Sequence, residues 1–416
     1  MQQCKKWSSN ILCQLLPGQP ERFGACYGNG PFYLQVALFV LILSGAVSAL
    51  ADGKMVVKPL LITGLAYESN YFLTEEDERE VSTFYIRPGI EFGYTTAKSN
   101  LLFNYLLDAN WYDEKGDPPA GEIGIDDYDY VGHDMEASAD TQLTDRLKIG
   151  IEDTYILTRD PDELDYYSNE IIRQKYAKNI LKPHLLYQFG EKFSLASSYA
   201  NTDINYKDDL NEDSKENRVD FTLHYTLTKL NSLDVKYQYW QKEYNGNTPD
   251  YDSNQAYITF NRELKYYTIS ASGGYHRRSF DSGLQQDTDN FIWSLSLKGS
   301  RPQMLFSLSQ NYNDTAVNND YYLATRFTAA IGHLFLQKLN VKLKAHYQYS
   351  DYLDNVDDRE DKSWDISCKL DYLRNEYLSF FLQPGYGARD SSLSGNDYDN
   401  TYILAGIQVN YDFGAK

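Results

Sequence analysis

From Lys54 to the end of the chain, apolar and polar side chains alternate with a period of two. Within residues 401–413, for example, Ile403 and Ile407 lie on one side of an extended chain, and Gln408 and Asn410 lie on the other. Successive side chains of a strand point to opposite faces, so each such segment has one apolar and one polar face. The same alternation recurs in segments 84–94, 219–227, 233–239 and 341–349.

The connections between these segments alternate in length. Short turns are predicted at 96–98, 143–145, 190–192, 228–230, 263–265, 299–301, 337–339 and 374–376. Longer acidic segments are predicted at 74–80, 113–127, 159–169, 207–216, 245–250, 281–287, 313–319, 353–362 and 389–397. This layout implies about eighteen strands, with about sixteen as the alternative, and an even number places both termini on the side of the short turns.

The predicted fold class is all-β: a single transmembrane antiparallel up-and-down β-barrel formed by residues 52–416. An open sheet would leave two edges of unpaired backbone groups, and each such group is costly in hydrocarbon, so only a closed sheet can span a membrane. A soluble β-sandwich or solenoid, the alternative, would not need a long loop at every second connection. Aromatic residues near strand ends predict interfacial girdles: Tyr67, Trp111, Tyr112, Tyr155, Tyr239, Trp240, Tyr275, Tyr312 and Tyr349.

One long apolar run, residues 34–50, lies near the N-terminus and ends in the small-x-small pattern Ala49-Leu50-Ala51. This pattern predicts that residues 1–51 are a signal peptide, cleaved after Ala51. A membrane anchor is the alternative, but the strongly apolar stretch is shorter than the ~20 residues that a spanning helix needs. The segment before the run is unusually long, which an over-extended start of the reading frame would explain.

Composition agrees with a membrane barrel. Tyrosine occurs 38 times, and its ring with a polar tip suits positions that have one apolar and one wet end. The mean hydropathy of −0.56 is typical of alternating strands as well as of soluble proteins. The 59 acidic and 39 basic residues give a net charge of −20, which argues against a nucleic-acid partner. After removal of the presequence Cys368 is the one remaining cysteine, so no internal disulfide is expected.

Charged residues on the polar faces predict the lining of a water-filled lumen, because Arg or Lys facing lipid at mid-membrane would cost ~2–4 kcal/mol. The predicted lumen-lining residues are Arg87, Glu91, Asp220, Asp234, Lys236, Lys342, Lys344, Lys369 and Asp371. Both signs occur, so the wall predicts no strong ion preference. The acidic loops are expected to disfavour anions at the outer entrance.

The chain resembles the outer-membrane porins described as "putative beta-barrel porin 2". The matching stretches are 64–70, 85–90, 381–391 and 398–413. The resemblance implies a porin-like barrel, and association with exopolysaccharide export in some relatives. Tyr411 and Phe413 resemble the C-terminal signal that the barrel assembly machinery recognises, although here Gly414-Ala415-Lys416 follow the final aromatic residue.

No enzyme motif emerges from the sequence. The histidines His133, His184, His224, His276, His333 and His346 are isolated from one another, and neither Gly-x-Ser-x-Gly nor His-Glu-x-x-His occurs. We predict no catalytic residues, no resident metal and no cofactor. Divalent cations could bind the acidic segments 126–127, 208–209 and 354–358, where they would bridge to lipopolysaccharide, although solvated loop tips are the simpler interpretation.

The sequence thus predicts an outer-membrane channel for hydrophilic solutes or polysaccharide. Its other expected partners are outer-membrane lipid, lipopolysaccharide and the assembly machinery. Two alternatives stay open: a non-conducting structural or surface-recognition barrel, and a membrane-embedded hydrolase.

Overall fold

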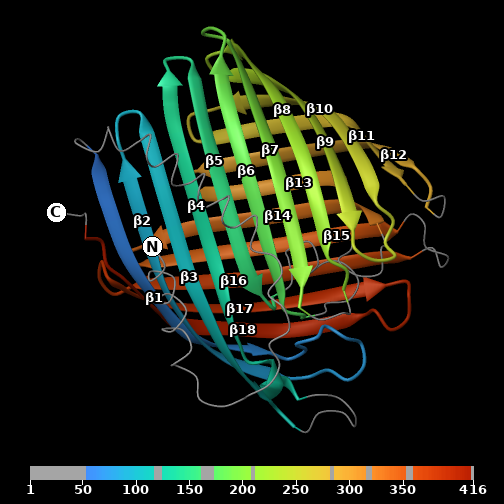
Figure 1. The fold of residues 1–416 in the computed structure, drawn as a ribbon. Helices are drawn as coiled ribbons and strands as arrows, with labels where there is room; N and C mark the ends of the chain where they lie inside the picture. The colour runs from blue at the N-terminus through green and yellow to red at the C-terminus, as the bar shows by residue number, and fades with distance from the viewer. Residues whose placement is uncertain are drawn as a thin grey trace, which may run out of the picture. The chain divides into compact units, whose positions relative to one another are not determined.

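The computed structural model describes residues 53–116, 124–160, 173–207, 211–281, 285–314, 321–352 and 359–413. Within them the chain forms one antiparallel sheet of 18 strands (Figure 1). The predicted signal peptide and its cleavage site lie outside the described residues. The strands are β1 (Lys54–Glu68), β2 (Val81–Thr95), β3 (Ser99–Glu114), β4 (Tyr130–Thr144), β5 (Leu147–Thr158), β6 (Tyr176–Gln188), β7 (Phe193–Tyr206), β8 (Ser214–Thr228), β9 (Asn231–Tyr244), β10 (Tyr251–Glu263), β11 (Tyr267–Phe280), β12 (Thr288–Ser300), β13 (Gln303–Asp314), β14 (Tyr321–Phe335), β15 (Leu339–Tyr352), β16 (Glu360–Leu373), β17 (Leu378–Ser391) and β18 (Tyr398–Asn410).

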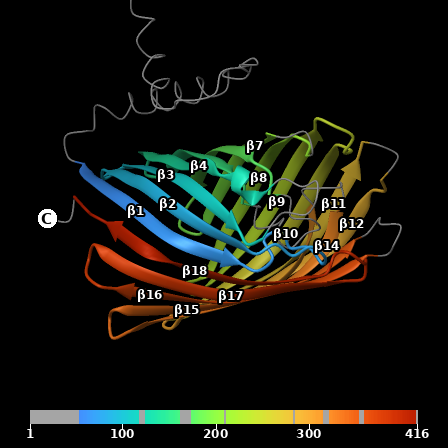
Figure 2. The ribbon, with the colours of Figure 1, turned by 90° about the horizontal axis from the view of Figure 1, so that it is seen from below.

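The sheet closes between its first and last strands, which lie side by side in Figure 2. β1 pairs with β18 from Leu60↔Asn410 to Glu68↔Tyr402. The C-terminal segment extends this seam, because the N–H of Tyr411 donates to Pro59 O (3.2 Å) and that of Phe413 donates to Val57 O (3.1 Å). The predicted all-β barrel with eighteen strands is confirmed, and among the described residues no helix is long and apolar enough to span a membrane.

Long and short connections alternate around the barrel as predicted. The short connections contain two to four residues and the long ones six to seventeen. Three of the short turns share one local device, in which a threonine hydroxyl accepts hydrogen bonds from the N–H groups two and three residues later. The donors are Lys98 and Ser99 for Thr96, Arg146 and Leu147 for Thr144, and Leu230 and Asn231 for Thr228. A side chain that satisfies turn N–H groups in this way favours a tight hairpin.

Five of the long hairpins share a second device, which we call the aspartate latch. The last residue of the loop is an aspartate directly before the next strand, and its carboxylate accepts a backbone N–H near the end of the preceding strand. The pairs are Asp129 with Tyr112 (2.8 Å), Asp213 with Tyr206 (2.7 Å), Asp250 with Tyr244 (2.8 Å), Asp287 with Phe280 (3.2 Å) and Asp397 with Ser391 (2.7 Å). Some of the acidic loop residues therefore stabilise the hairpins through hydrogen bonds to the backbone.

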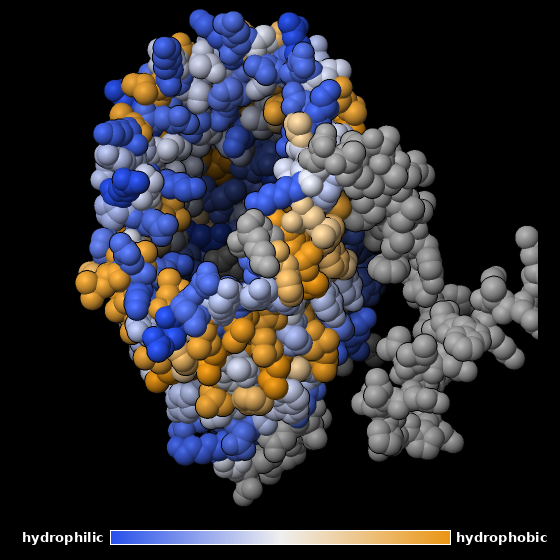
Figure 3. All heavy atoms as spheres, turned by 90° about the vertical axis from the view of Figure 1, so that its left-hand side faces the viewer, coloured by the Kyte–Doolittle hydropathy of each residue, from blue (hydrophilic) through white to orange (hydrophobic). Residues whose placement is uncertain are grey.

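The two faces of the wall differ as the alternation predicts. Large apolar side chains such as Ile90, Leu223 and Leu343 are exposed on the outer face, and Figure 3 shows hydrophobic residues around the outside of the wall and a hollow lined with hydrophilic residues. On the outer face, Tyr237 and Tyr239 donate their hydroxyls to Asn254 and Asp252 on β10 (2.8 and 3.2 Å). An apolar belt edged by hydrogen-bonded tyrosines suits the boundary between lipid and water.

Three of the predicted girdle aromatics are instead buried: Tyr112, Trp240 and Tyr312. Tyr112 follows the exposed Trp111, and Trp240 follows Tyr239 in the outer girdle. Neighbouring residues of a strand point to opposite faces, so only one member of each pair can face lipid. Tyr312 is buried for a different reason, which is described below.

We expect Leu223→Arg, on the outer face near the middle of β8, to lower the free energy of unfolding by ~2–4 kcal/mol, because the charge would face hydrocarbon. Urea titration of the barrel folded in liposomes measures this. Thr222→Arg, one residue away on the inner face, is the matched control and should have little effect. Equal losses from both variants would contradict the assignment of the two faces.

Asp250→Ala should lower the free energy of unfolding by about 1 kcal/mol, because the Tyr244 N–H loses its acceptor. Asp250→Asn keeps an oxygen at the same position and should retain most of the stability. The same urea titration compares the variants. If Asn and Ala were equally destabilising, charge and not the latch geometry would be the important property of Asp250.

Candidate channel interior

All nine predicted lumen-lining residues lie on the face opposite the exposed apolar side chains. They are Arg87 and Glu91 on β2, Asp220 on β8, Asp234 and Lys236 on β9, Lys342 and Lys344 on β15, and Lys369 and Asp371 on β16. Neighbours on the same strands, such as Phe221, Val235 and Leu343, are exposed on the outside. Most of the nine lie in the half of the barrel nearer the short turns.

The structure does not gather these residues in one cluster. Lys369 and Asp371 pair with each other, and four of the others pair with residues outside the set. Their pairs with ionisable partners are Arg87–Asp108 (2.6 Å), Glu91–Lys58 (3.0 Å), Asp220–Arg218 (3.1 Å), Asp234–His224 (2.6 Å) and Lys369–Asp371 (3.5 Å). The Lys236 ammonium lies 5.4 Å from the centre of the Tyr257 ring, and Lys342 pairs in register with Lys369. Charges of both signs therefore follow one another along the wall, and their role as the lining of a water-filled lumen stays a prediction.

One histidine has a triad-like arrangement. His224 Nδ1 lies 2.6 Å from Asp234 Oδ1, and its Nε2 lies 3.4 Å from the hydroxyl of Thr226. Thr226 is paired with Ser232 in the strand ladder, and the register shift follows it. An acyl-transfer site also needs backbone N–H groups free to bind an oxyanion, whereas the ladder uses those of the strand. This geometry does not support the hydrolase alternative.

The inner face becomes more enclosed toward the long loops. On β15, Lys342 and Lys344 are exposed, whereas His346, Gln348, Ser350 and Tyr352 are buried. On β16 the inward residues from Asp361 to Ser367 are likewise buried. Buried polar side chains need partners, and several of these find them in one another: Gln348 donates to Ser350 (2.8 Å), and the Tyr352 hydroxyl donates to Asp361 (3.2 Å). The interior is therefore open near the short turns and filled near the long loops.

Arginines stacked on aromatic rings form much of this filled region, which we call the arginine–tyrosine collar. Its members are Arg173 over Tyr71 (3.8 Å), Arg278 over Tyr251 (4.0 Å), Arg359 over Tyr352 (4.5 Å) and Arg389 over Tyr398 (4.8 Å). Each guanidinium also has an oxygen partner, respectively Glu68 (2.7 Å), Ser253 (3.2 Å), Asp361 (2.5 Å) and Asn396 O (2.6 Å). Outside the strands, burial raises the pKa of Tyr71, so its hydroxyl stays neutral.

The wall itself changes between β12 and β13. Their register runs only from Ser300↔Gln303 to Trp293↔Gln310, although both strands continue toward the loop side. Above that point β12 stays paired with β11, and β13 stays paired with β14. The two hairpins therefore separate at the end that carries the long loops.

The freed end of β13–β14, described over residues 311–314 and 321–324, turns inward; we call it the β13–β14 tip. Asn311 Oδ1 lies 3.2 Å from Nδ1 of His276, a buried residue on the inner face of β11. The Tyr312 ring packs edge-on against His276 (5.2 Å), and Tyr321 contacts Phe280 (5.0 Å). These contacts reach across β12 to β11, so the tip covers part of the inside of β11 and β12. They also explain why Tyr312 is buried and not part of a girdle.

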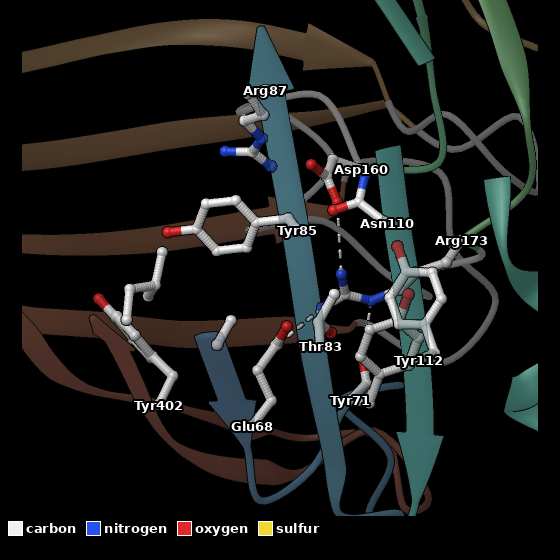
Figure 4. Close-up of a pocket in the computed structure, with 12 residues that line it drawn as sticks. Glu68, Tyr71, Thr83, Tyr85, Arg87, Asn110, Tyr112, Asp160, Arg173 and Tyr402 are labelled. Atoms are coloured by element: carbon white, nitrogen blue, oxygen red, sulfur yellow. Dashed lines mark hydrogen bonds and ion pairs between the residues drawn. The ribbon is translucent and has the colours of Figure 1, made fainter. Parts of the chain in front are cut away.

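A cavity of about 290 Å³ lies on the inner wall beside the seam (Figure 4). It is lined by Ala66 and Glu68 of β1, Thr83, Tyr85 and Arg87 of β2, Asn110 and Tyr112 of β3, Tyr402 and Leu404 of β18, and Tyr71, Asp160 and Arg173 from loop segments. Arg173 lies at its centre and joins Glu68 (2.7 Å) to Asp160 (3.8 Å).

Two glycines determine how the tyrosines of this cavity lie. A β-carbon on Gly64 would overlap the Ala405 carbonyl oxygen and the Tyr85 hydroxyl, and one on Gly385 would overlap the Tyr402 ring. Each ring thus covers a glycine on a neighbouring strand, an arrangement that compensates for the missing side chain. Tyr402 is further fixed by its hydroxyl, which donates to Asp365 (2.8 Å).

Tyr411 and Phe413, the predicted assembly signal, lie at the short-turn end. Tyr411 stacks on Tyr377 (5.1 Å) and contacts Phe413 (4.7 Å). Their recognition by assembly machinery stays a prediction. Among the residues that the structure describes, no group of three or more His, Cys, Asp or Glu side chains could hold a metal ion. The acidic segments 208–209 and 354–358, and the side chains of 126–127, lie outside that part.

Residues 268–411 match a protein-family model described as "Putative beta-barrel porin 2", which confirms the predicted resemblance over β11–β18. No curated protein matches the sequence. Among solved structures, the chain is similar to Pseudomonas aeruginosa OpdK, crystallised with vanillate (11% identity, TM-score 0.48, 85% of this chain and 99% of that one). It is also similar to Acinetobacter baumannii OccAB4 (11%, 0.49, 87% and 99%) and to a BenF-like porin from Pseudomonas fluorescens Pf-5 (10%, 0.48, 87% and 100%).

The closed barrel, its apolar outer belt and the family match agree on a porin-like β-barrel of the bacterial outer membrane, as the sequence predicts. The identity with solved porins is too low to carry over a solute.

Replacing Asp361 by Leu should lower the free energy of unfolding by ~3–5 kcal/mol, because Arg359 would be left buried and unpaired. The double variant Arg359→Leu, Asp361→Leu removes both charges and should recover most of that loss. Urea unfolding in liposomes compares the two. A double variant as unstable as the single one would show that the ion pair is not the source of the effect.

Proposed function

We propose that the protein is a channel for hydrophilic solutes whose outer entrance is narrowed by the β13–β14 tip and the arginine–tyrosine collar. The observation that carries this proposal is the contrast along the inner wall. Charged side chains such as Lys342 and Lys344 are exposed near the short turns, whereas the same faces are buried near the long loops. A polar wall retains water, and the narrowest place determines what passes.

The solute class follows from the charges and from the family resemblance. The wall carries both signs in local pairs, so neither anions nor cations are strongly favoured along it. The acidic loops disfavour anions at the entrance, an effect screened beyond ~8 Å at physiological salt. The finer proposal is therefore a neutral hydrophilic solute of the saccharide class, with polysaccharide export as the physiological setting. Neighbouring genes for polysaccharide polymerisation or export would support that setting.

Reconstitution in planar bilayers tests the channel directly. We expect ohmic conductance that increases with salt concentration. A folded barrel that shows no conductance at any voltage, with or without the tip substitution below, would instead favour the non-conducting structural or surface-recognition alternative.

The tip should limit conductance. Tyr312→Ala removes the ring that packs on His276, which frees the tip from the inner face of β11. We expect a higher single-channel conductance with unchanged ion selectivity, because the substituted group is uncharged. Tyr347→Ala, on the outer face of β15, is the control and should leave conductance unchanged. Unchanged conductance in the Tyr312 variant would place the constriction elsewhere.

A further inference from the structure

The cavity beside the seam contains hydrogen-bond donors that the protein does not use. Asn110 is only 4% exposed, and among the described residues its Nδ2 has no hydrogen-bond partner. Leaving such a group unsatisfied costs ~1–3 kcal/mol. Its position on the cavity wall (Figure 4) makes a bound molecule the natural acceptor.

Arg87 supplies a second set of donors. Its Nε donates to Asp108 (2.6 Å), and its guanidinium lies 4.5 Å from the centre of the Tyr85 ring. Within the described part of the chain, its two terminal nitrogens make no further hydrogen bond. In Figure 4 they point over the cavity above Tyr85 and Tyr402. A planar guanidinium held at Nε and free at its tip presents donors of fixed geometry.

The charges of the cavity largely compensate one another. Arg87 is paired with Asp108, and Arg173 is shared between Glu68 and Asp160. An anion bound to Arg87 would lie close to Asp108, and a cation bound to Asp160 would lie close to Arg173. A neutral molecule that both accepts and donates hydrogen bonds avoids either repulsion, because carboxylate oxygens of Glu68 and Asp160 line the same space as the free donors.

Apolar groups complete the lining. Ala66, Leu404 and the ring of Tyr402 lie on the seam side of the cavity. Tyr402 is held between Gly385 and Asp365, so its ring is a fixed surface. A pyranose ring has both properties that such a lining requires, hydroxyl groups around its edge and apolar C–H groups on its faces.

We propose that this cavity is a binding site for one neutral sugar unit, with Asn110 and Arg87 donating to its hydroxyl oxygens, Glu68 or Asp160 accepting from its hydroxyls, and Tyr402 against its apolar face. The site rests on the proposed channel function, in which it holds a saccharide at the narrow end of the lumen. It identifies the chemical class that the channel recognises and the residues that recognise it.

The test uses three probes with the same ring and different charge: glucose, glucuronate and glucosamine. Binding to the mature full-length barrel in detergent is measured by saturation-transfer NMR or calorimetry. We expect glucose to bind more tightly than either charged probe. Asn110→Ala should weaken glucose binding roughly three- to tenfold, the loss of one hydrogen bond. Arg87→Lys, which keeps the charge beside Asp108 but loses the forked donors, should weaken it similarly.

Thr222→Ala, on the inner face of β8 and outside the cavity, is the matched control and should leave glucose binding unchanged. A difference in electrophoretic migration between unheated and heated protein verifies that each variant is folded. Tighter binding of glucuronate, or glucose binding that Asn110→Ala and Arg87→Lys leave unchanged, would overturn the proposal.

Conductance is measured separately on the same preparations, so the two proposals can fail independently. A barrel that conducts but binds no glucose overturns the sugar site alone. A barrel that binds glucose with the expected loss in both variants supports the site, even where no current is seen and the channel proposal fails.

Discussion

The structure depends on one constraint: in hydrocarbon every backbone N–H and C=O must find its partner within the protein. This requirement makes the sheet close on itself, and the closing contact is the seam between β1 and β18. The seam is completed by the backbone of the C-terminal segment, where Tyr411 and Phe413 donate to Pro59 and Val57. The terminal aromatic residues thus contribute hydrogen bonds to closure itself, besides any part they have in recognition during assembly.

The features that follow directly from this constraint could be predicted from sequence. Alternation identified the strands and the two faces of residues such as Leu343 and Lys344, and the alternating loop lengths gave the even strand number. These are local properties of each segment. The arginine–tyrosine collar could not be predicted, because Arg278 meets Tyr251, and Arg359 meets Tyr352, only once the register of neighbouring strands is known. The inward turn of the β13–β14 tip was missed for a related reason, since nothing in the alternation of β12 or β13 marks where their pairing stops.

The aspartate latches could be predicted from sequence only in part. The sequence shows an acidic residue directly before a strand at Asp213, Asp250 and Asp287, and this position is itself a signal of the latch. Loop acidity alone predicts solvation or cation binding, because composition does not distinguish a free carboxylate from one that accepts a backbone N–H. The stretches behind the family resemblance show the same principle on a larger scale. Gly64 and Glu68, Tyr85 and Arg87, and Tyr402 belong to separate stretches, and closure of the barrel brings all of them to one cavity.

Closure also determines where selectivity can arise. A wall of about eighteen strands encloses more space than its own side chains fill, whereas about eight strands enclose just enough for them. In the proposed channel, charges on the open part of the wall would therefore face water at a distance from a passing solute. Glu91 with Lys58 and Lys369 with Asp371 are such charges, and each pair partly cancels. A residue can contact a solute in two situations. Either it projects inward from the wall, or it belongs to a part of the wall where other residues fill the lumen. In this chain both conditions are met at the long-loop end, by the β13–β14 tip on one part of the wall and by the collar and the seam cavity on another. In the proposed channel, recognition would thus be concentrated in a few buried polar residues there, while the rest of the lumen would only have to hold water.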